Sequence, residues 1–330
     1  MDKPYLLFLG DASDNLAAKS ARGVLDWRPG TCLGQIRLNG CKADLGLPDM
    51  TVAEAAGGGV KTMIIGVAKA GGVIPDNWTM SIIAALDAGM DIASGMHTRL
   101  ADIAPIAEAA KRNGRHLFDA RHPTRTFAVG TGSKRTGKRL LPVGTDCSCG
   151  KMYTALALER EMQARGMKAD FRATGQSGIF IAGDGIAVDA VVADFISGAI
   201  EWLAPDNDDD HWDLIEGQGS LFHPSFAGVS MGLLHGAQPD ALVLCHEPTR
   251  THMRALPERP LPGLAECIEA NLQAARLTSP DVTFVGVSMD TSRLSETDRE
   301  TVLAEAEAEL GVPCVDPVAT SVDRIVDGLV

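Results

Sequence analysis

The residues best suited to chemistry lie between Leu140 and Thr154, in the sequence LLPVGTDCSCGKMYT. An apolar run meets a glycine-rich turn, which ends in Gly-Lys and opens into a helical pattern. Such a turn directs backbone N–H groups, the positive end of the next helix and a lysine ammonium at anionic oxygens. The sequence therefore predicts a phosphate-binding turn, called the cradle below. Its residues are Gly144, Thr145, Asp146, Cys147, Ser148, Cys149, Gly150, Lys151, Met152 and Tyr153.

The cradle departs from a standard P-loop at two points. Five residues rather than four separate Gly144 from Gly150, and Met152 stands where serine or threonine usually offers a hydroxyl to magnesium. A Mg-nucleotide loses a usual ligand there. A diphosphate that needs no metal, such as that of coenzyme A, therefore fits at least as well as ATP. The alternative is a glycine-rich turn with a chance Gly-Lys pair.

Length and composition limit the class of protein. The 330 residues exceed the usual size of one core and predict two domains, and 45% hydrophobic residues with 35 glycines are typical of an α/β enzyme. A net charge of −13 argues against a nucleic-acid partner. Because no apolar run is long enough to span a bilayer, we expect a cytoplasmic protein with no membrane partner.

The seven cysteines are scattered and odd in number, which indicates reduced thiols rather than a disulfide framework. Cys147 and Cys149 lie in the cradle without a second Cys/His pair at zinc spacing, so we expect no metal site. Cys149 stands near a helix N-terminus, where a thiol can become reactive. The plainer interpretation is a small side chain that lines a tight loop.

The first 125 residues alternate short apolar runs with helical patterns, which predicts a parallel sheet with helices on both faces. We assign residues 1–125 to this Rossmann-like domain, with strands at 5–9, 32–38, 62–68, 91–96 and 115–120. No G-x-G-x-x-G follows the first strand, so we predict no nicotinamide site.

Residues 126–330 form the second predicted domain, a P-loop-type three-layer α/β/α sandwich. Its expected strands lie at 139–143, 169–174, 212–216, 241–245 and 282–287, and its helices at 151–165, 187–203, 263–276 and 296–310. A cationic connection joins the two domains. Its charges are either solvated or hold an additional phosphate; they are Lys134, Arg135, Lys138 and Arg139.

Ligands collect beyond the carboxyl ends of the strands in an open parallel sheet, and two segments after the cradle carry suitable groups. In ATGQSG, Gln176 and Ser177 offer side-chain hydrogen bonds, although a plain turn explains them equally well. Asp194 falls on the apolar pattern VDAVVADFISGAIEWL. A carboxylate on such a helix needs a partner or a raised pKa, which makes Asp194 a candidate base or cation partner.

Two later segments add further candidates. Glu216 ends an apolar strand and His223 follows on the same loop, where the imidazole either transfers protons or makes a structural hydrogen bond. The segment HEPTRTHMR follows another strand and also carries His246. Its Arg250 and Arg254 could grip a dicarboxylate as bidentate forks, with surface salt bridges as the alternative.

Two families share these motifs. The segments GTDCSCGK and IEGQGS resemble the GTDTxVGKT turn and EGAGG strand end of dethiobiotin synthetases, although Met152 replaces their threonine and no biotin-precursor site is identified. More of the chain resembles two-domain bacterial proteins with a Rossmann-like first half and a P-loop second half, a family that includes D-glutamate N-acetyltransferase. The resemblance covers nearly the whole length, through GTDCSCGKMYTALAL, ATGQSGIFI, VDAVVADFISGA, EGQGSLFHPSF and HEPTRTHMR.

This second resemblance implies transfer of acetyl from acetyl-coenzyme A to the amine of D-glutamate, with the cradle holding coenzyme phosphates. From residue chemistry we expect Asp194 or His223 as the base and Glu216 as the group that orients it. Substrate contacts would come from Gln176, Ser177, Arg250 and Arg254. We also expect a homo-oligomer, because many helix faces are apolar.

Two other hypotheses remain open. In an ATP-dependent ligase or kinase, Thr145 or Thr154 would replace the missing hydroxyl, and Glu216 with Asp194 would bind magnesium. In a nucleotide-binding regulatory protein, the same cluster would bind a ligand without catalysis.

Overall fold

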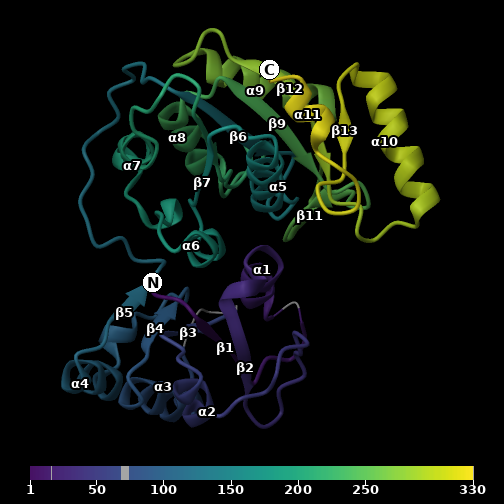
Figure 1. Ribbon diagram of the computed structural model, residues 1–330. Helices are drawn as coiled ribbons and strands as arrows, with labels where there is room; N and C mark the ends of the chain where they lie inside the picture. The colour runs from purple at the N-terminus through teal and green to yellow at the C-terminus, as the bar shows by residue number, and fades with distance from the viewer. Residues whose placement is uncertain (16, 68–73, 330) are drawn as a thin grey trace. The chain divides into compact units, whose positions relative to one another are not determined.

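A computed structural model describes residues 1–15, 17–67 and 74–329. The chain divides into two compact units (Figure 1). The first comprises Met1–Arg125 with Gly175–Ala190, and the second comprises Thr126–Thr174 with Val191–Val330.

A five-stranded parallel sheet forms the centre of the first unit, in the order β2-β1-β3-β4-β5. Its strands are β1 (Tyr5–Gly10), β2 (Cys32–Arg37), β3 (Thr62–Ile65), β4 (Asp91–Ser94) and β5 (Leu117–Asp119). The helices between them are α1 (Lys19–Trp27), α2 (Val52–Gly57), α3 (Asp76–Asp87) and α4 (Ala104–Asn113). Helices α2, α3 and α4 lie on one side of the sheet and α1 on the other (Figure 1). The predicted alternation is confirmed, although the strand expected at 62–68 ends at Ile65, and Ala68 lies outside the described residues.

The segment Gly175–Ala190 belongs to the first unit, although the division at residue 125 placed it in the second domain. Its helix α6 (Gln176–Ala182) packs beside α1, where the Ser177 and Ser20 hydroxyl oxygens are 2.9 Å apart. The Arg121 guanidinium binds both the Gln176 side chain and the Asp189 carboxylate. A domain boundary read along the sequence misses this segment because α6 covers the same side of the sheet as α1 (Figure 1).

A six-stranded parallel sheet forms the centre of the second unit, in the order β13-β12-β9-β6-β8-β7. Its strands are β6 (Lys138–Gly144), β7 (Ala169–Arg172), β8 (Trp212–Ile215), β9 (Ala241–His246), β12 (Thr283–Met289) and β13 (Cys314–Val315). A short antiparallel pair, β10 (His252–Met253) and β11 (Leu256–Pro260), follows β9. The helices are α5 (Lys151–Ala164), α7 (Ile196–Leu203), α8 (Ala227–Ala237), α9 (Leu264–Arg276), α10 (Glu296–Leu310) and α11 (Asp323–Asp327). The predicted α/β fold with two parallel sheets is confirmed.

Strand β6 is buried almost throughout and lies between β9 and β8. Buried apolar strands of this kind are typical of parallel sheets covered on both faces. Whatever follows β6 therefore lies in the middle of the carboxyl edge of the sheet, with the ends of β8 and β9 on either side.

The helix expected at 187–203 is shorter than predicted. Helix α7 begins at Ile196, and two 3-10 turns precede it, at Val188–Ala190 and Ala193–Phe195. The chain passes from the first unit to the second between Ala190 and Val191, within the range predicted as one helix. Asp194 is exposed on the second turn. The premise that its carboxylate is buried on an apolar helix is therefore wrong.

Two of the connection's cations are buried, contrary to the prediction. Arg135 is 8% exposed and donates hydrogen bonds to backbone carbonyls at the ends of α7 and α8. Arg139 is fully buried, and its guanidinium binds the carbonyls of Thr136 and Arg135. Neither guanidinium is solvated or directed at a phosphate. Lys134 is exposed, as expected, and pairs with Asp240 at 2.8 Å.

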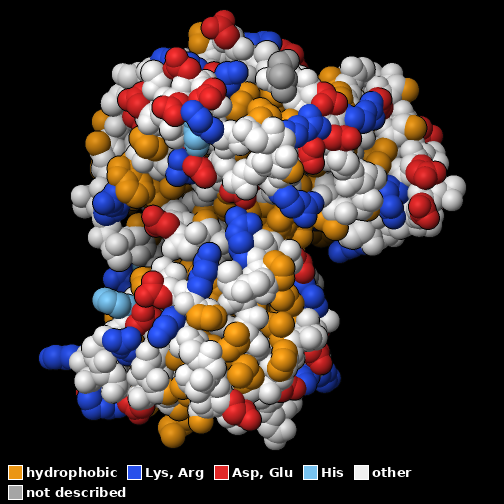
Figure 2. Space-filling model, viewed as in Figure 1, with side chains coloured by type: hydrophobic (Ala, Val, Ile, Leu, Met, Phe, Trp, Pro, Cys, Tyr) orange, Lys and Arg blue, Asp and Glu red, His pale blue; other side chains and the backbone are white. Residues whose placement is uncertain are grey.

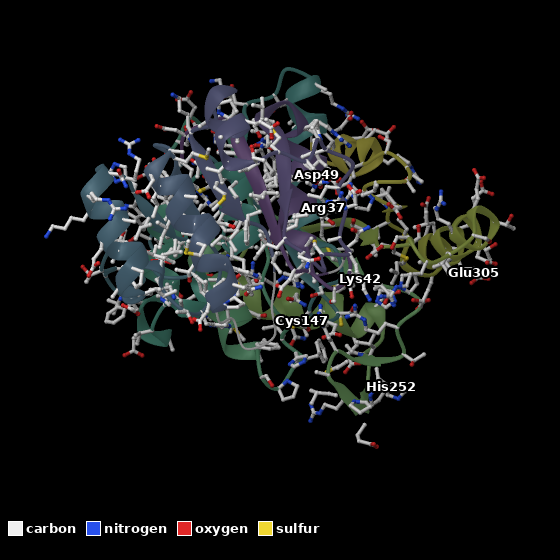
Figure 3. The ribbon with its side chains drawn as sticks, turned by 90° about the horizontal axis from the view of Figure 1, so that it is seen from below. Arg37, Lys42, Asp49, Cys147, His252 and Glu305 are labelled. Atoms are coloured by element: carbon white, nitrogen blue, oxygen red, sulfur yellow. The ribbon has the colours of Figure 1, made fainter. Side chains whose placement is uncertain are left out.

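Charged side chains of both signs are interspersed over the visible surface (Figure 2). One ion pair of the first unit, between Arg37 and Asp49, joins the end of β2 to the loop that follows, and the two side chains point toward one another in Figure 3. Across the described ranges, no helix combines the length and the hydrophobicity needed to cross a bilayer.

Candidate anion-binding site

The cradle begins at Gly144, the last residue of β6, and continues through the turn into the first residues of α5, which begins at Lys151. Ser148 and Gly150 adopt positive φ angles of 51° and 97°. Gly144 leaves no room for a side chain, because a Cβ there would lie 2.7 Å from Cys149 Sγ and 2.8 Å from Lys151 Nζ. The turn therefore closes tightly around the lysine side chain.

Backbone donors of the cradle are free to bind an anion. Among the described residues, none accepts a hydrogen bond from the backbone N–H of Ser148, Cys149, Gly150, Lys151 or Met152. These five groups come from the turn and from the start of α5, where the helix macrodipole is positive. Consecutive donors with alternating backbone conformations form a concave nest suited to phosphate oxygens.

Lys151 adds a positive charge inside this nest. Its side chain is only 6% exposed, and Nζ donates to Asp146 O at 2.8 Å and lies 3.5 Å from Cys149 Sγ. Cys149 is buried, and its thiol donates to Asp146 O at 3.0 Å. This environment agrees with the plainer interpretation of Cys149 as a small side chain lining the loop.

Asp146 is fully buried and links the cradle to the segment after β9. Its Oδ2 accepts hydrogen bonds from Arg250 Nη1 and from the Arg254 backbone N–H, both at 2.7 Å, and its Oδ1 accepts from the Cys147 N–H at 2.7 Å. Arg250 also donates to the carbonyls of Cys147 and Ser148. Figure 3 labels Cys147 in the turn and His252 on β10.

These contacts correct the expected role of Arg250. The Arg250 guanidinium binds the cradle itself, so it is not free to grip a dicarboxylate. Burial lowers the pKa of Arg250, but its bonds to Asp146 raise that pKa overall, and the charge persists at any physiological pH. The Arg254 guanidinium donates to the Ser148 hydroxyl and is exposed.

Glu216 lies directly after β8, at the strand end where the sequence placed it, and is 4% exposed. Its carboxylate accepts the Thr174 N–H at 2.9 Å, and the Thr174 hydroxyl donates to Glu216 O at 2.5 Å. The next residue, Gly217, packs so closely on β6 that a Cβ would lie 1.7 Å from Pro142 O. These contacts fix the ends of β7 and β8 beside the cradle strand.

His223 is buried, and both of its ring nitrogens are engaged by the backbone. Because a carbonyl oxygen can only accept, Nε2 donates to Arg254 O at 3.2 Å, and Nδ1 accepts the Ser225 N–H at 3.2 Å. No lone pair of the imidazole remains for a substrate proton. The structure therefore contradicts the assignment of His223 as the base. It indicates instead that His223 holds the backbone at Arg254 in place.

His246 fits a proton acceptor better, although the sequence identified it only as a polar residue. It ends β9, whose neighbour is β6, and its Nδ1 is 3.0 Å from Thr145 Oγ1. In the described chain, no hydrogen bond uses its Nε2. Burial lowers the pKa of His246; Glu247 opposes this shift and Arg250 adds to it, so the ring is neutral at pH 7. The order of the strands could have identified His246 as a site residue, because the strand that it ends, β9, pairs with the cradle strand β6.

Three groups near the cradle could be considered for a metal. Ligand atoms of Asp146, Cys147 and His223 lie within 4.8 Å of one another. However, Asp146 is paired with Arg250, His223 is engaged at both nitrogens, and burial raises the pKa of Cys147 to about 11 against the opposing charge of Lys151. The set therefore fits a hydrogen-bonded turn better than a cation site.

The remaining predicted residues do not join the cradle. Gln176 and Ser177 belong to the first unit and are engaged by Arg121 and Ser20. Thr154 directs its hydroxyl to Ser288 Oγ at 2.8 Å and to Gly150 O, so it does not replace the hydroxyl missing at Met152.

The fold and site together define a class of α/β protein, with a Rossmann-like unit and a P-loop unit whose cradle follows the central strand. Residues 36–123 match the Rossmann-like domain DUF1611_N and residues 126–326 match the P-loop domain DUF1611_C, both described as domains of unknown function. The chain belongs to the DUF1611 family.

Proteins with similar sequences and structures support this family assignment. A Tritonibacter scottomollicae protein named D-glutamate N-acetyltransferase is 55% identical over 100% of this chain and 99% of its own. A Pseudoalteromonas protein of the same name is 51% identical over 99% and 98%. The crystal structure of a DUF1611 family protein from Anabaena variabilis ATCC 29413 matches with a TM-score of 0.88 at 32% identity and covers 99% of each chain. The family resemblance of the sequence motifs is confirmed.

Proposed function

We propose that this protein is an N-acetyltransferase that moves the acetyl group of acetyl-coenzyme A to the amine of D-glutamate. Two relatives with this name, 55% and 51% identical over almost their whole lengths, support the activity and the acceptor. The cradle is the structural observation that supports coenzyme A. It offers the Lys151 ammonium and five N–H groups that find no acceptor in the described part of the chain, and it carries Met152 where magnesium would need a hydroxyl.

In this reaction the neutral amine of D-glutamate attacks the thioester carbonyl. A C–N bond forms and the C–S bond breaks, a base takes the proton from the attacking nitrogen, and the leaving coenzyme A thiolate receives that proton from the base and departs as the thiol. We assign this base to His246. With its Nδ1–H donating to the Thr145 hydroxyl oxygen, Nε2 keeps the lone pair that accepts the proton. This assignment requires the pantetheine arm to fold back from the cradle along the carboxyl edge of the sheet.

The other expected roles are revised accordingly. Glu216 fixes the strand ends beside the cradle, and Gln176 with Ser177 holds α6 in the first unit. Arg254 is the arginine we assign to the substrate carboxylates, because its guanidinium is exposed. We propose that no metal takes part.

A thiol-release assay tests this function. Acetyl-coenzyme A is offered with a panel of D- and L-amino acids in the presence of EDTA, and we expect release to be fastest with D-glutamate. Lys151→Met should weaken coenzyme A binding, whereas Lys168→Met, which removes an exposed cation paired with Asp208 and Asp210, should not. Binding of ATP that requires Mg²⁺, together with no response to coenzyme A, would support the ligase or kinase hypothesis instead.

We further propose a homo-oligomer in the cytoplasm. Large apolar side chains on the surface of the second unit, such as Trp202 at 46% and Phe226 at 45% exposure, support self-association. Light scattering of the purified protein over a range of concentrations tests the assembly, and cell fractionation tests the location.

A further inference from the structure

Arg250 contacts the cradle through both terminal nitrogens of its guanidinium group. Nη1 donates to Asp146 Oδ2 and to Cys147 O, both at 2.7 Å, and Nη2 donates to Ser148 O at 3.0 Å. Nε lies 3.4 Å from Glu247 Oε2, which completes the set of partners. We propose that Arg250 is a positioning residue that organises the cradle in place of a divalent cation, so that phosphate binds without metal. This inference rests on the proposed function for the identity of the ligand.

The orientation of the peptide planes explains how Arg250 acts. In a trans peptide the C=O of one residue and the N–H of the next point in opposite directions. Because Arg250 holds the carbonyls of Cys147 and Ser148, the N–H groups of Ser148 and Cys149 must point away from it. Two of the five unpaired donors are thus directed by Arg250 before any ligand arrives. A donor set oriented in advance binds more tightly, because less conformational freedom is lost on binding.

Arg250 also acts through its charge. Asp146 is fully buried within the cradle, where a lone carboxylate would repel phosphate oxygens. Arg250 pairs with this carboxylate at 2.7 Å and offsets its charge, while the second carboxylate beside Arg250, that of Glu247, also lies 3.9 Å from Arg293 Nη1. Among the described residues the Lys151 ammonium donates to the neutral Asp146 carbonyl and the Cys149 sulfur, so its positive charge remains available to the ligand.

Removing the arginine should therefore create a requirement for metal. A P-loop that uses magnesium places hard oxygen ligands beside the phosphates. In an Arg250→Ala variant, the Asp146 carboxylate would lose its charged partner. Its oxygens and those of the phosphate could then bind Mg²⁺ together. An Asp146→Asn, Arg250→Ala double variant lacks the carboxylate and could not bind Mg²⁺ in this way.

Calorimetric titration of the full-length protein with coenzyme A, in EDTA and then in Mg²⁺, tests this inference. We expect the affinity of the unchanged protein to be independent of Mg²⁺. Arg250→Ala should bind roughly 10- to 100-fold more weakly in EDTA, the range of one or two charge-assisted hydrogen bonds. Mg²⁺ should restore part of this loss in Arg250→Ala and none in the double variant. Arg112→Ala, which removes an exposed cation of the first unit, is the matched control.

Turnover separates a positioning role from general damage to the fold. In Arg250→Ala the KM for acetyl-coenzyme A should rise while kcat at saturation changes little. If this variant is insoluble, Arg250→Lys serves instead: it keeps a charge for Asp146 but cannot span both carbonyls, so affinity should fall without any response to Mg²⁺. Undiminished affinity of either variant in EDTA would overturn the inference, as would equal rescue of the single and double variants by Mg²⁺.

Inorganic pyrophosphate as a second probe separates this inference from the proposed function. If the unchanged protein binds pyrophosphate but not coenzyme A, the acetyltransferase proposal fails, while the same comparison of variants still decides the role of Arg250. If it binds neither, both proposals are overturned.

Discussion

Replacement of Arg135 should destabilise the second unit far more than replacement of its neighbour Lys134. Arg135 Nη1 donates to Ala204 O at 2.8 Å and to Ile200 O at 3.4 Å, at the end of α7. Nη2 donates to Gly236 O at 2.6 Å and to Ala237 O at 3.1 Å, at the end of α8. The last carbonyls of a helix have no partner within the helix, so one guanidinium satisfies both helix ends.

The expected loss follows from these contacts. Burial lowers the pKa of Arg135 to about 10, with the charge of Arg139 acting in the same direction, so the guanidinium is still protonated at pH 7. Leaving a buried carbonyl without its hydrogen-bond donor costs about 1–3 kcal/mol, and Arg135→Ala leaves several carbonyls without one. The favourable interaction of a cation with a helix C-terminus adds about 0.3–1 kcal/mol for each helix. The cost of burying the charge offsets part of this sum, so we expect Arg135→Ala to lose about 3–5 kcal/mol.

Urea unfolding, followed by circular dichroism and tryptophan fluorescence, measures this loss. Arg135→Met keeps most of the side-chain volume but leaves the carbonyls unpaired, so it should lose nearly as much as Arg135→Ala. Lys134→Ala removes one exposed ion pair with Asp240 and should change stability by less than about 1 kcal/mol. The reasoning is refuted if Arg135→Met unfolds at the same urea concentration as the unchanged protein, or if Lys134→Ala loses as much as Arg135→Ala.

Two further predictions concern the carboxyl edge of the sheet and the chemistry there. In the same urea assay, Gly217→Ala should lower the free energy of unfolding by about 1–3 kcal/mol, because its Cβ would lie 1.7 Å from Pro142 O. The control Gly228→Ala, in α8, places a Cβ that meets nothing within 4 Å. It should leave the free energy of unfolding unchanged or raise it by up to about 1 kcal/mol. Because the pKa of His246 is lowered from 6.5, the acid limb of kcat should lie below pH 6.5, with the neutral base fully present above it. His246→Gln should lower kcat roughly 10²- to 10⁴-fold and remove that limb; an unchanged pH profile in this variant would exclude His246 as the base.

Local sequence was enough to predict the cradle and the position of Glu216. The cradle needs only a buried strand, a glycine-rich turn and a helix in immediate succession, and all three are encoded between Lys138 and Ala164. Glu216 ends a short apolar run, so its place at the edge of the sheet follows from the strand alone.

Features that depend on distant partners were not predictable in this way. Arg135 has the same sequence environment as Lys134, and only the ends of α7 and α8 determine that one is buried and the other exposed. Helix α8, AGVSMGLLHGA, was missed because small and apolar residues all around it give no clear polar face. The sequence alone assigns residues 175–190 to the second domain. In the structure, contacts with Arg121 and α1 hold this segment in the first unit.

The order of the strands explains why the cradle motif alone does not settle its chemistry. Its N–H groups and lysine are supplied locally, whereas Arg250 and His246 come from β9 and the segment after it, about a hundred residues later in the chain. Because β9 pairs directly with β6, both side chains reach the same turn. A protein with the same Gly-Thr-Asp turn but another residue at the position of Arg250 would keep the anion nest and also an unpaired buried aspartate. With Arg250 acting as we propose, such a turn should bind phosphate only with a cation present. The residue after β9, rather than the glycine-rich motif, would then determine whether the site needs a metal.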